Sequence, residues 1–151
     1  MVNVAILGFG TVGSGVAEVL SKNAEHIDQK VETPVRLKYI LDLRDFPDSP
    51  FGDKVVHDFS VIENDPTVEI VVETIGGATV ALDYTRRALS AGKSVVSSNK
   101  ELVAEHGWEL LQLAAQKGVS YLFEASVGGG IPILRPLTSC LAANELTQVT
   151  G

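Results

Sequence analysis

Val2-Asn3-Val4-Ala5-Ile6-Leu7-Gly8-Phe9-Gly10-Thr11-Val12-Gly13 opens the chain with an apolar run that three closely spaced glycines follow at once. The run is rich in β-branched residues, which is typical of a central parallel strand covered on both faces. Apolar residues at positions 12, 16, 19 and 20 share one face of a helix, so a helix is predicted directly after the glycines. A strand, a glycine turn and a helix in direct succession begin a βαβ unit.

The three glycines have the spacing Gly-x-Gly-x-x-Gly, which between a strand and a helix is the dinucleotide-binding fingerprint. Gly8 permits the tight turn, Gly10 lets backbone N–H groups approach a pyrophosphate, and Gly13 lets the helix pack closely on the strand. The helix N-terminus favours the anion. The alternative is a glycine-rich turn without a ligand. The predicted cofactor contacts in this turn are Gly8, Phe9, Gly10, Thr11, Val12 and Gly13.

The rest of the chain alternates short apolar runs with longer amphipathic ones. Further strands are predicted over 35–43, 55–56, 68–74, 94–97 and 119–125. Helices are predicted over 58–63, 78–91 and 101–117, and Pro132 is placed to open a last one. The pattern predicts an α/β fold, a Rossmann-type doubly wound and mostly parallel sheet, in one domain over residues 1–151.

The composition excludes several classes of partner. Twelve Lys and Arg against 19 Asp and Glu give a formal net charge of −7, so neither nucleic acid nor an anionic membrane is an expected partner. The longest uncharged run, residues 2–17, is too short to span a bilayer and has no basic residue ahead of it. A cytoplasmic location is therefore expected. The lone Cys140 has no His or second Cys at metal spacing and is predicted to be a small buried hydrophobe.

The second predicted strand ends in Leu41-Asp42-Leu43-Arg44-Asp45, where a Rossmann domain contacts the adenosine ribose. A carboxylate there accepts hydrogen bonds from the ribose hydroxyls and selects NAD, whereas an arginine pairs with a 2′-phosphate and selects NADP. Both residue types are present, so NADP and NAD both stay open as cofactors. Arg44 is the candidate phosphate contact, and an ordinary solvated loop pair is the alternative for Arg44 and Asp45.

Two later strand ends carry further candidates at the same edge of the sheet. Thr74-Ile75-Gly76-Gly77 follows the fourth strand, where the strand order should reverse, so Thr74, Ile75 and Gly76 are candidate cofactor contacts. Lys100 follows the fifth strand and can orient a phosphate or carboxylate, or relay a proton. The alternatives are a plain strand-to-helix turn and a solvated lysine.

The segment Phe123-Glu124-Ala125-Ser126-Val127-Gly128-Gly129-Gly130-Ile131-Pro132 places three glycines before a proline. Such a segment can turn its carbonyl groups toward a common point. Glu124 beside them could complete an oxygen-lined site for a hard monovalent cation. A simple glycine hinge is the alternative.

These motifs together resemble the N-terminal, nucleotide-binding part of homoserine dehydrogenases. The resemblance runs from Val2 to Gly151. The motifs that carry it are 8–13, Glu73-Thr74-Ile75-Gly76-Gly77, Ser98-Asn99-Lys100 and 124–132. The first of these motifs is shared by many folds, whereas the last two together are specific to the family. The resemblance implies NAD(P)-dependent interconversion of L-homoserine and L-aspartate 4-semialdehyde, on the route from aspartate to threonine, methionine and isoleucine.

The same resemblance implies particular site residues. It places a sodium or other monovalent ion at Glu124 and at the backbone carbonyls of Val127, Gly129 and Ile131. It also gives Lys100 a role near the nicotinamide.

Homoserine dehydrogenases continue into a substrate-binding and dimerising domain that supplies the catalytic Asp and Lys. The resemblance therefore implies that this chain is the N-terminal part of a longer homo-oligomeric enzyme, with its main acid and base residues beyond Gly151. The chain alone should bind nucleotide without turnover. Two alternative functions are considered. One is a dehydrogenase with a cysteine nucleophile, for which Cys140 is a poor candidate. The second is a nucleotide-sensing Rossmann regulatory module. A regulatory module of this kind needs neither Lys100 nor the glycine-rich segment after Glu124.

Overall fold

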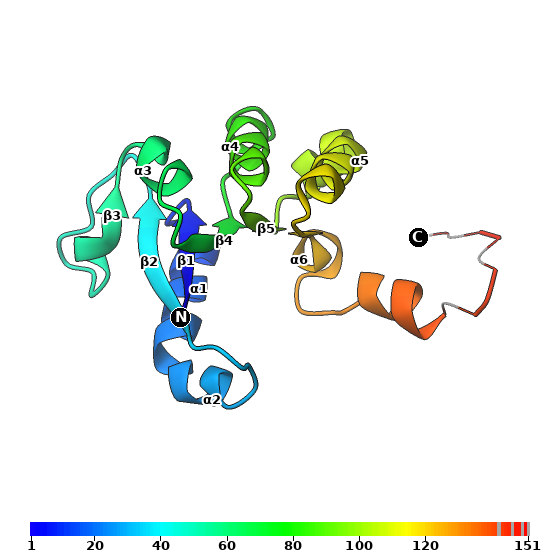
Figure 1. Cartoon of the computed structure of the whole chain (residues 1–151), viewed down its shortest axis with the longest axis horizontal. Coiled ribbons are helices and arrows are strands. Elements are labelled where there is room, and N and C mark those ends of the chain that lie inside the picture. The colour runs from blue at the N-terminus through cyan, green and yellow to red at the C-terminus, as the bar shows by residue number, and fades with distance from the viewer. Residues whose placement is uncertain (142, 146, 149, 151) are drawn as a thin grey trace.

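The computed structural model describes residues 1–141, 143–145, 147–148 and 150. Six strands form one sheet in the order β3-β2-β1-β4-β5-β6, and every pair of neighbours is parallel (Figure 1). The strands are β1 Val2–Leu7, β2 Val35–Leu41, β3 Val55–Val56, β4 Val68–Glu73, β5 Ser94–Ser97 and β6 Tyr121–Leu122. The order reverses between β1 and β4, which confirms the doubly wound Rossmann fold.

The helices are α1 Thr11–Lys22, α2 Ala24–Asp28, α3 Phe59–Glu63, α4 Thr79–Ser90, α5 Lys100–Lys117 and α6 Glu124–Gly128. Four of them, α1, α3, α4 and α5, follow the local signals of the sequence, whereas those signals do not predict α2 and α6. Asp58 caps α3 by accepting the N–H of Ser60 at 2.8 Å, and Gly118 ends α5 in the left-handed conformation at φ 68°. Among the described residues, no helix combines the length and the apolar character needed to cross a membrane.

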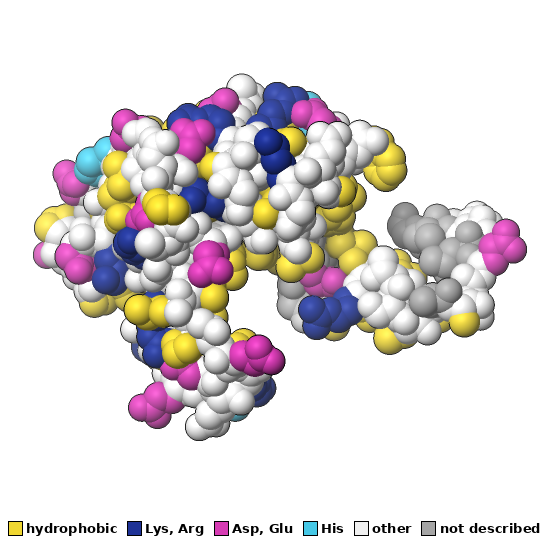
Figure 2. All heavy atoms as spheres, viewed as in Figure 1, with side chains coloured by type: hydrophobic (Ala, Val, Ile, Leu, Met, Phe, Trp, Pro, Cys, Tyr) yellow, Lys and Arg dark blue, Asp and Glu magenta, His cyan; other side chains and the backbone are white. Residues whose placement is uncertain are grey.

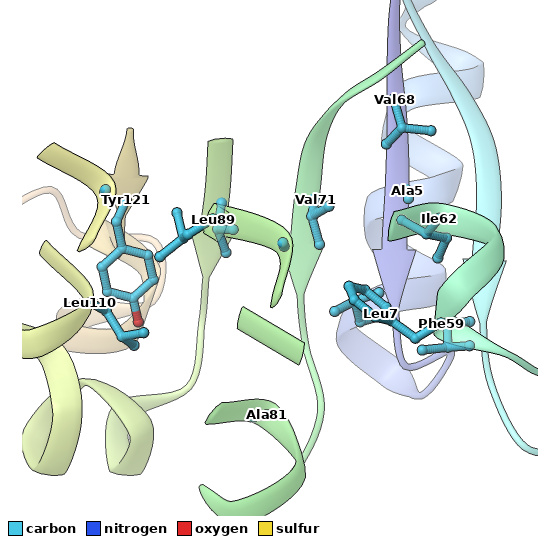
Figure 3. Packing of buried hydrophobic residues seen from close by; sticks show 14 of the residues in the cluster. Ala5, Leu7, Phe59, Ile62, Val68, Val71, Ala81, Leu89, Leu110 and Tyr121 are labelled. Carbon is cyan, nitrogen blue, oxygen red and sulfur yellow. The ribbon is translucent and has the colours of Figure 1, made fainter. Parts of the chain in front are cut away.

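Successive residues of the strands enter two hydrophobic clusters on opposite faces of the sheet. On β1, Ala5 and Leu7 belong to the larger cluster under α3, α4 and α5, while Ile6 between them belongs to the cluster under α1. Figure 3 shows the larger cluster, which extends from Phe59 near one end to Tyr121 at the other. Both faces of the central strands are therefore covered, which explains why β1 and β4 are mostly apolar.

The buried face of α1 agrees only in part with the predicted one, because Val16 packs against the cluster under the helix but Val12 and Val19 do not. Gly13 and Ala17, four residues apart, are buried against the sheet, whereas Val12 and Val19 are 52% and 53% exposed. Small residues at the contact allow the helix axis to approach the strands closely. Close approach, rather than the size of the apolar side chains, thus selects the buried face.

Two predicted strand ends are also corrected. β2 stops at Leu41 instead of position 43, and the strand predicted over 119–125 contains only Tyr121 and Leu122, which pair with β5. The carbonyl of Phe123 accepts hydrogen bonds from the N–H and the Oγ of Ser126, at 3.0 Å and 2.7 Å. These two bonds turn the chain into α6, so Glu124 begins a helix instead of ending a strand.

The segment after α6 extends away from the sheet, as the orange and red part of Figure 1 shows. Residues 134–140 are helical, shortly after Pro132, so the predicted last helix is present; its second part, Pro136–Cys140, is π-helical. Cys140 is exposed, and the prediction of a buried thiol is wrong. The thiol is exposed because the segment around it extends away from the sheet and does not pack onto it (Figure 1).

Candidate functional site

Two adjoining clefts lie at the carboxyl ends of the central strands. The first, of about 520 Å³, is lined by residues 8–10, 41–44 and 74–76 with Val80 and Tyr84. The second, of about 490 Å³, is lined by residues 74–77, 98–101, 125–127 and Gly129. Both clefts share the wall of Thr74, Ile75 and Gly76, so they adjoin one another and are together called the crevice. This crevice lies where the strand order reverses, the usual ligand position in open α/β sheets.

The fingerprint glycines have separate physical roles in the first cleft. Gly8 adopts a φ of +89°, which L side chains rarely adopt. A Cβ at Gly13 would lie 1.9 Å from the carbonyl oxygen of Gly8, so the helix and the turn are in direct contact there. A Cβ at Gly10 would meet no atom within 4 Å. Gly13 is therefore required for packing, whereas the space at Gly10 is open to a ligand.

The N-terminus of α1 points at this open space. Gly10 occupies the N-cap position, no side chain caps the helix, and its first turn contains no acidic residue. Thr11 and Val12 are exposed there. Among the described residues, the first N–H groups of α1 thus have no competing side-chain acceptor and can bind an anion.

Phe9 anchors the glycine turn. Its ring packs against Phe46, with ring centroids 4.9 Å apart, and belongs to the cluster under α1. Its N–H donates to Oδ2 of Asp42 at 2.8 Å. The Phe9 side chain therefore supports the cleft from below, and its backbone forms part of the cleft wall.

Asp42 and Arg44 form an ion pair beside the glycine turn. Oδ1 of Asp42 accepts the backbone N–H of Arg44 at 3.0 Å and its Nε–H at 3.1 Å. Desolvation acts to raise the pKa of Asp42, but hydrogen bonds from Arg44 and from the N–H of Phe9 outweigh it and lower the pKa to about 2. The carboxylate is thus ionised and already occupied by donors of the protein, while the Arg44 guanidinium, 65% exposed, lines the first cleft.

His57, at the end of β3, supports the same loop from outside the cleft. Its Nδ1 lies 2.7 Å from the carbonyl oxygen of Asp42, and its Nε2 lies 3.0 Å from Oδ1 of Asp45. The hydrogen bond to the Asp42 carbonyl and the neighbouring Asp45 carboxylate raise the pKa of His57. The sequence contains no local signal for this contact, because Asp42 is 15 residues away.

The residues between the two clefts brace one another. The Oγ1 of Thr74 donates to the carbonyl oxygens of Leu7 and Gly8, at 2.9 Å and 3.0 Å. Thr74 therefore ties the end of β4 to the glycine turn. Across the crevice, Nδ2 of Asn99 donates to the carbonyls of Ile75 and Gly77, at 3.0 Å and 2.8 Å.

Lys100 is the first residue of α5, directly after the Asn99 cap. Oδ1 of Asn99 accepts the N–H of Leu102 at 3.1 Å, which fixes the start of the helix. Lys100 is exposed and lines the second cleft, as predicted for a residue at the carboxyl edge.

The predicted cation-binding segment also reaches the second cleft, through Val127 and Gly129. The carboxylate of Glu124 accepts the backbone N–H groups of Ile133, of Leu134 at 2.8 Å and of Arg135 at 2.9 Å. These hydrogen bonds, that of Ile133 first, lower the pKa of Glu124. Ile131 is exposed, and its N–H donates to the carbonyl of Gly128 at 3.1 Å.

The proteins to which the chain is similar are homoserine dehydrogenases. The family model for homoserine dehydrogenase, NAD binding domain, matches residues 8–124. A homoserine dehydrogenase of Neisseria gonorrhoeae is 38% identical over 156 residues, which cover 99% of this chain and 35% of that protein. The crystal structure of a homoserine dehydrogenase from Thiobacillus denitrificans matches with a TM-score of 0.87 and 38% identity, over 95% of this chain and 34% of that one.

A hyperthermophilic archaeal homoserine dehydrogenase in complex with NADPH is also similar, with a TM-score of 0.74 and 25% identity over 90% of this chain and 47% of that one. The chain spans about a third of the length of the curated relatives that it matches, such as 35% of the protein from Neisseria gonorrhoeae.

The glycine geometry predicts opposite effects at two positions of the turn. Gly10→Val should change the free energy of unfolding by less than about 1 kcal/mol but weaken dinucleotide binding, because its side chain enters the open space. Gly13→Ala should destabilise the fold by about 1–3 kcal/mol or more through its contact with Gly8. Urea unfolding and a dinucleotide titration measure both effects. Unchanged affinity in a folded Gly10→Val protein would count against this site.

Proposed function

The chain belongs to the family of homoserine dehydrogenase NAD-binding domains, and we propose that it is the dinucleotide-binding part of an enzyme that interconverts L-homoserine and L-aspartate 4-semialdehyde. The two adjoining clefts at the switch point carry the proposal, since a dinucleotide has two halves and the clefts share the wall of Thr74, Ile75 and Gly76. The NADPH complex of the archaeal relative supports NADP or NAD as the cofactor.

Different residues of the crevice would bind different parts of such a cofactor. The N–H groups that follow Gly10 hold the pyrophosphate at the start of α1, and Arg44 lies beside the adenosine ribose. Thr74, Ile75 and Gly76 line the middle of the crevice, and Lys100 lies at its far end. When bound, the nicotinamide supplies the hydride chemistry, and Lys100 orients the substrate or holds a proton at Nζ.

Apart from Lys100, which is better suited to orientation, no proton donor for the substrate oxygen is evident among the described residues of the crevice. Among the described residues, neither cleft is lined by a histidine or a cysteine. We propose that the main acid and base groups come from a substrate-binding and dimerising domain of a longer homo-oligomeric protein. Exposed apolar side chains on β6, α6 and the segment after it support a docking surface there; they are Leu122, Val127, Ile131 and Ile133. Figure 2 shows hydrophobic side chains between the body of the molecule and the terminal segment.

A monovalent cation at the segment after Glu124 is part of the proposal. In the described part of the chain, no hydrogen bond reaches the carbonyl oxygens of Val127, Gly129 or Ile131. The carboxylate of Glu124, whose pKa is lowered, adds a negative charge to the same segment. Unpaired carbonyls near an ionised carboxylate are the donor set that a hard cation such as sodium prefers.

The first test of the proposed function is a titration of NADPH and NADH into the chain, followed by nicotinamide fluorescence. We expect saturable binding but negligible oxidation of added homoserine, because a positioned general acid contributes about 10²–10⁴-fold in rate. Failure of both nucleotides to bind contradicts the proposal. Robust turnover that Lys100→Ala abolishes would place the catalytic centre in this chain.

The choice between NADP and NAD is tested at Arg44. Arg44→Ala should weaken NADPH binding by about tenfold or more, since a charge-assisted hydrogen bond contributes about 1.5–3 kcal/mol, and should change NADH binding little. Arg86→Ala is a matched control, because Arg86 pairs with Glu109 on α5, away from the clefts. Equal losses of affinity for NADPH and NADH would contradict the assignment of Arg44 to the 2′-phosphate.

The cation is tested by thermal unfolding in sodium chloride and in tetramethylammonium chloride at equal ionic strength. Sodium should raise the Tm of the wild-type chain, because a ligand of the folded state stabilises it, and Glu124→Gln should remove this difference. Glu109→Gln, which removes a carboxylate on α5, should keep it. The same Tm in both salts for the wild-type chain would exclude the proposed ion.

A further inference from the structure

One buried acidic residue has no part in the function proposed above. Glu73 is the last residue of β4 and is 0% exposed. It lies directly below the wall that the two clefts share, yet it lines neither of them. Its carboxyl group therefore cannot touch the cofactor, and any role must act through the residues that it contacts.

The carboxyl group of Glu73 connects two loops. Oε1 accepts the N–H of Ile75 at 2.7 Å, in the loop after β4. Oε2 lies 2.5 Å from Oγ of Ser97, at the end of β5. The Ser97 Oγ in turn accepts the N–H of Asn99 at 3.1 Å, and Asn99 donates back to the carbonyl of Ile75 at 3.0 Å. The four residues form a closed ring of hydrogen bonds between the loops.

Burial of this carboxyl group is costly, because no Lys or Arg among the described residues is hydrogen-bonded to it. Desolvation raises the pKa of Glu73, and the hydrogen bonds from Ser97 and Ile75 oppose this shift only in part. An apolar residue at the end of an apolar strand would avoid the cost. The ring of hydrogen bonds is the compensating gain that the structure shows.

We propose that Glu73 is a positioning residue that holds the loop 74–77 and the loop 97–100 at a fixed separation, and so sets the shape of the second cleft. The inference rests on the proposed function, which places the nicotinamide half of the cofactor in that cleft. Lys100 and Gly77 lie at the ends of the two loops and line the same cleft. A clamp between the loops therefore determines where Lys100 stands relative to the nicotinamide.

The first cleft has its own braces, which makes the proposal specific. Thr74 bonds to the carbonyls of Leu7 and Gly8, and Asp42 bonds to the N–H of Phe9, without any contribution from Glu73. Ile75 lines both clefts, but Thr74 still ties its loop to the glycine turn when Glu73 is replaced. Loss of the clamp should therefore loosen the nicotinamide half of the site much more than the adenosine half. A residue with a general role in the core would affect both halves.

The test compares two ligands, NADPH and 2′-phosphoadenosine 5′-diphosphoribose, which lacks the nicotinamide. Glu73→Ala should weaken NADPH by about tenfold, the effect of losing two ordinary hydrogen bonds, and leave the second ligand within about twofold. Glu73→Gln should restore most of the NADPH affinity. Its amide oxygen can accept the N–H of Ile75, and its amide N–H₂ can donate to Oγ of Ser97.

Ile62→Ala serves as the matched control, since Ile62 lies on the buried face of α3 and lines neither cleft. It should lower the Tm without changing the ratio of the two affinities.

Ser97→Ala removes the other end of the clamp and tests the proposal if Glu73→Ala does not fold. The same selective loss of NADPH affinity is expected for Ser97→Ala. Equal weakening of both ligands in Glu73→Ala or in Ser97→Ala, or unchanged NADPH affinity in a folded variant, would overturn the clamp. A wild-type chain that binds neither ligand would instead contradict the proposed function on which the clamp rests.

Discussion

The contact between α1 and the turn before it constrains the whole carboxyl edge of the sheet. Because a Cβ at Gly13 would lie 1.9 Å from the carbonyl oxygen of Gly8, only glycine allows the helix to start so close to β1. That approach directs the N–H groups of the first helical turn into the crevice. The neighbouring strands then hold the turn from both sides, through Asp42 after β2 and Thr74 after β4.

Polar side chains along this edge bind mainly to backbone groups of the protein itself. Asp42, Thr74 and Asn99 each donate to or accept from backbone groups of adjacent loops. Backbone N–H groups and the long side chains of Arg44 and Lys100 remain to face a ligand. Rigid loops present these groups in a fixed arrangement, and this preorganisation reduces the entropy lost on binding.

Local charge, not net charge, decides which ligand the crevice suits. The chain carries a net charge of −7, which by itself disfavours an anionic cofactor. In the crevice, however, the first turn of α1 lacks acidic residues, and Arg44 compensates the carboxylate of Asp42. Arg44 lines the first cleft and Lys100 the second, so each of the two clefts has a basic side chain in its wall.

Local signals in the sequence account for the order of the strands, the fingerprint turn, the helices α1, α3, α4 and α5, and caps such as Asp58 and Gly118, because these signals lie within a few residues of one another. They do not predict α2 or the start of α6 at Glu124. A charged residue at the end of an apolar strand was a signal for Glu73, but its partner Ser97 is 24 residues away. The nucleotide and cation contacts remain predictions. Only the tertiary structure decided that Gly13 and Ala17 form the buried face of α1, that the last strand stops at Leu122, and that Cys140 is exposed. Each of these depends on what packs against the residue, and packing partners distant in sequence leave no local pattern.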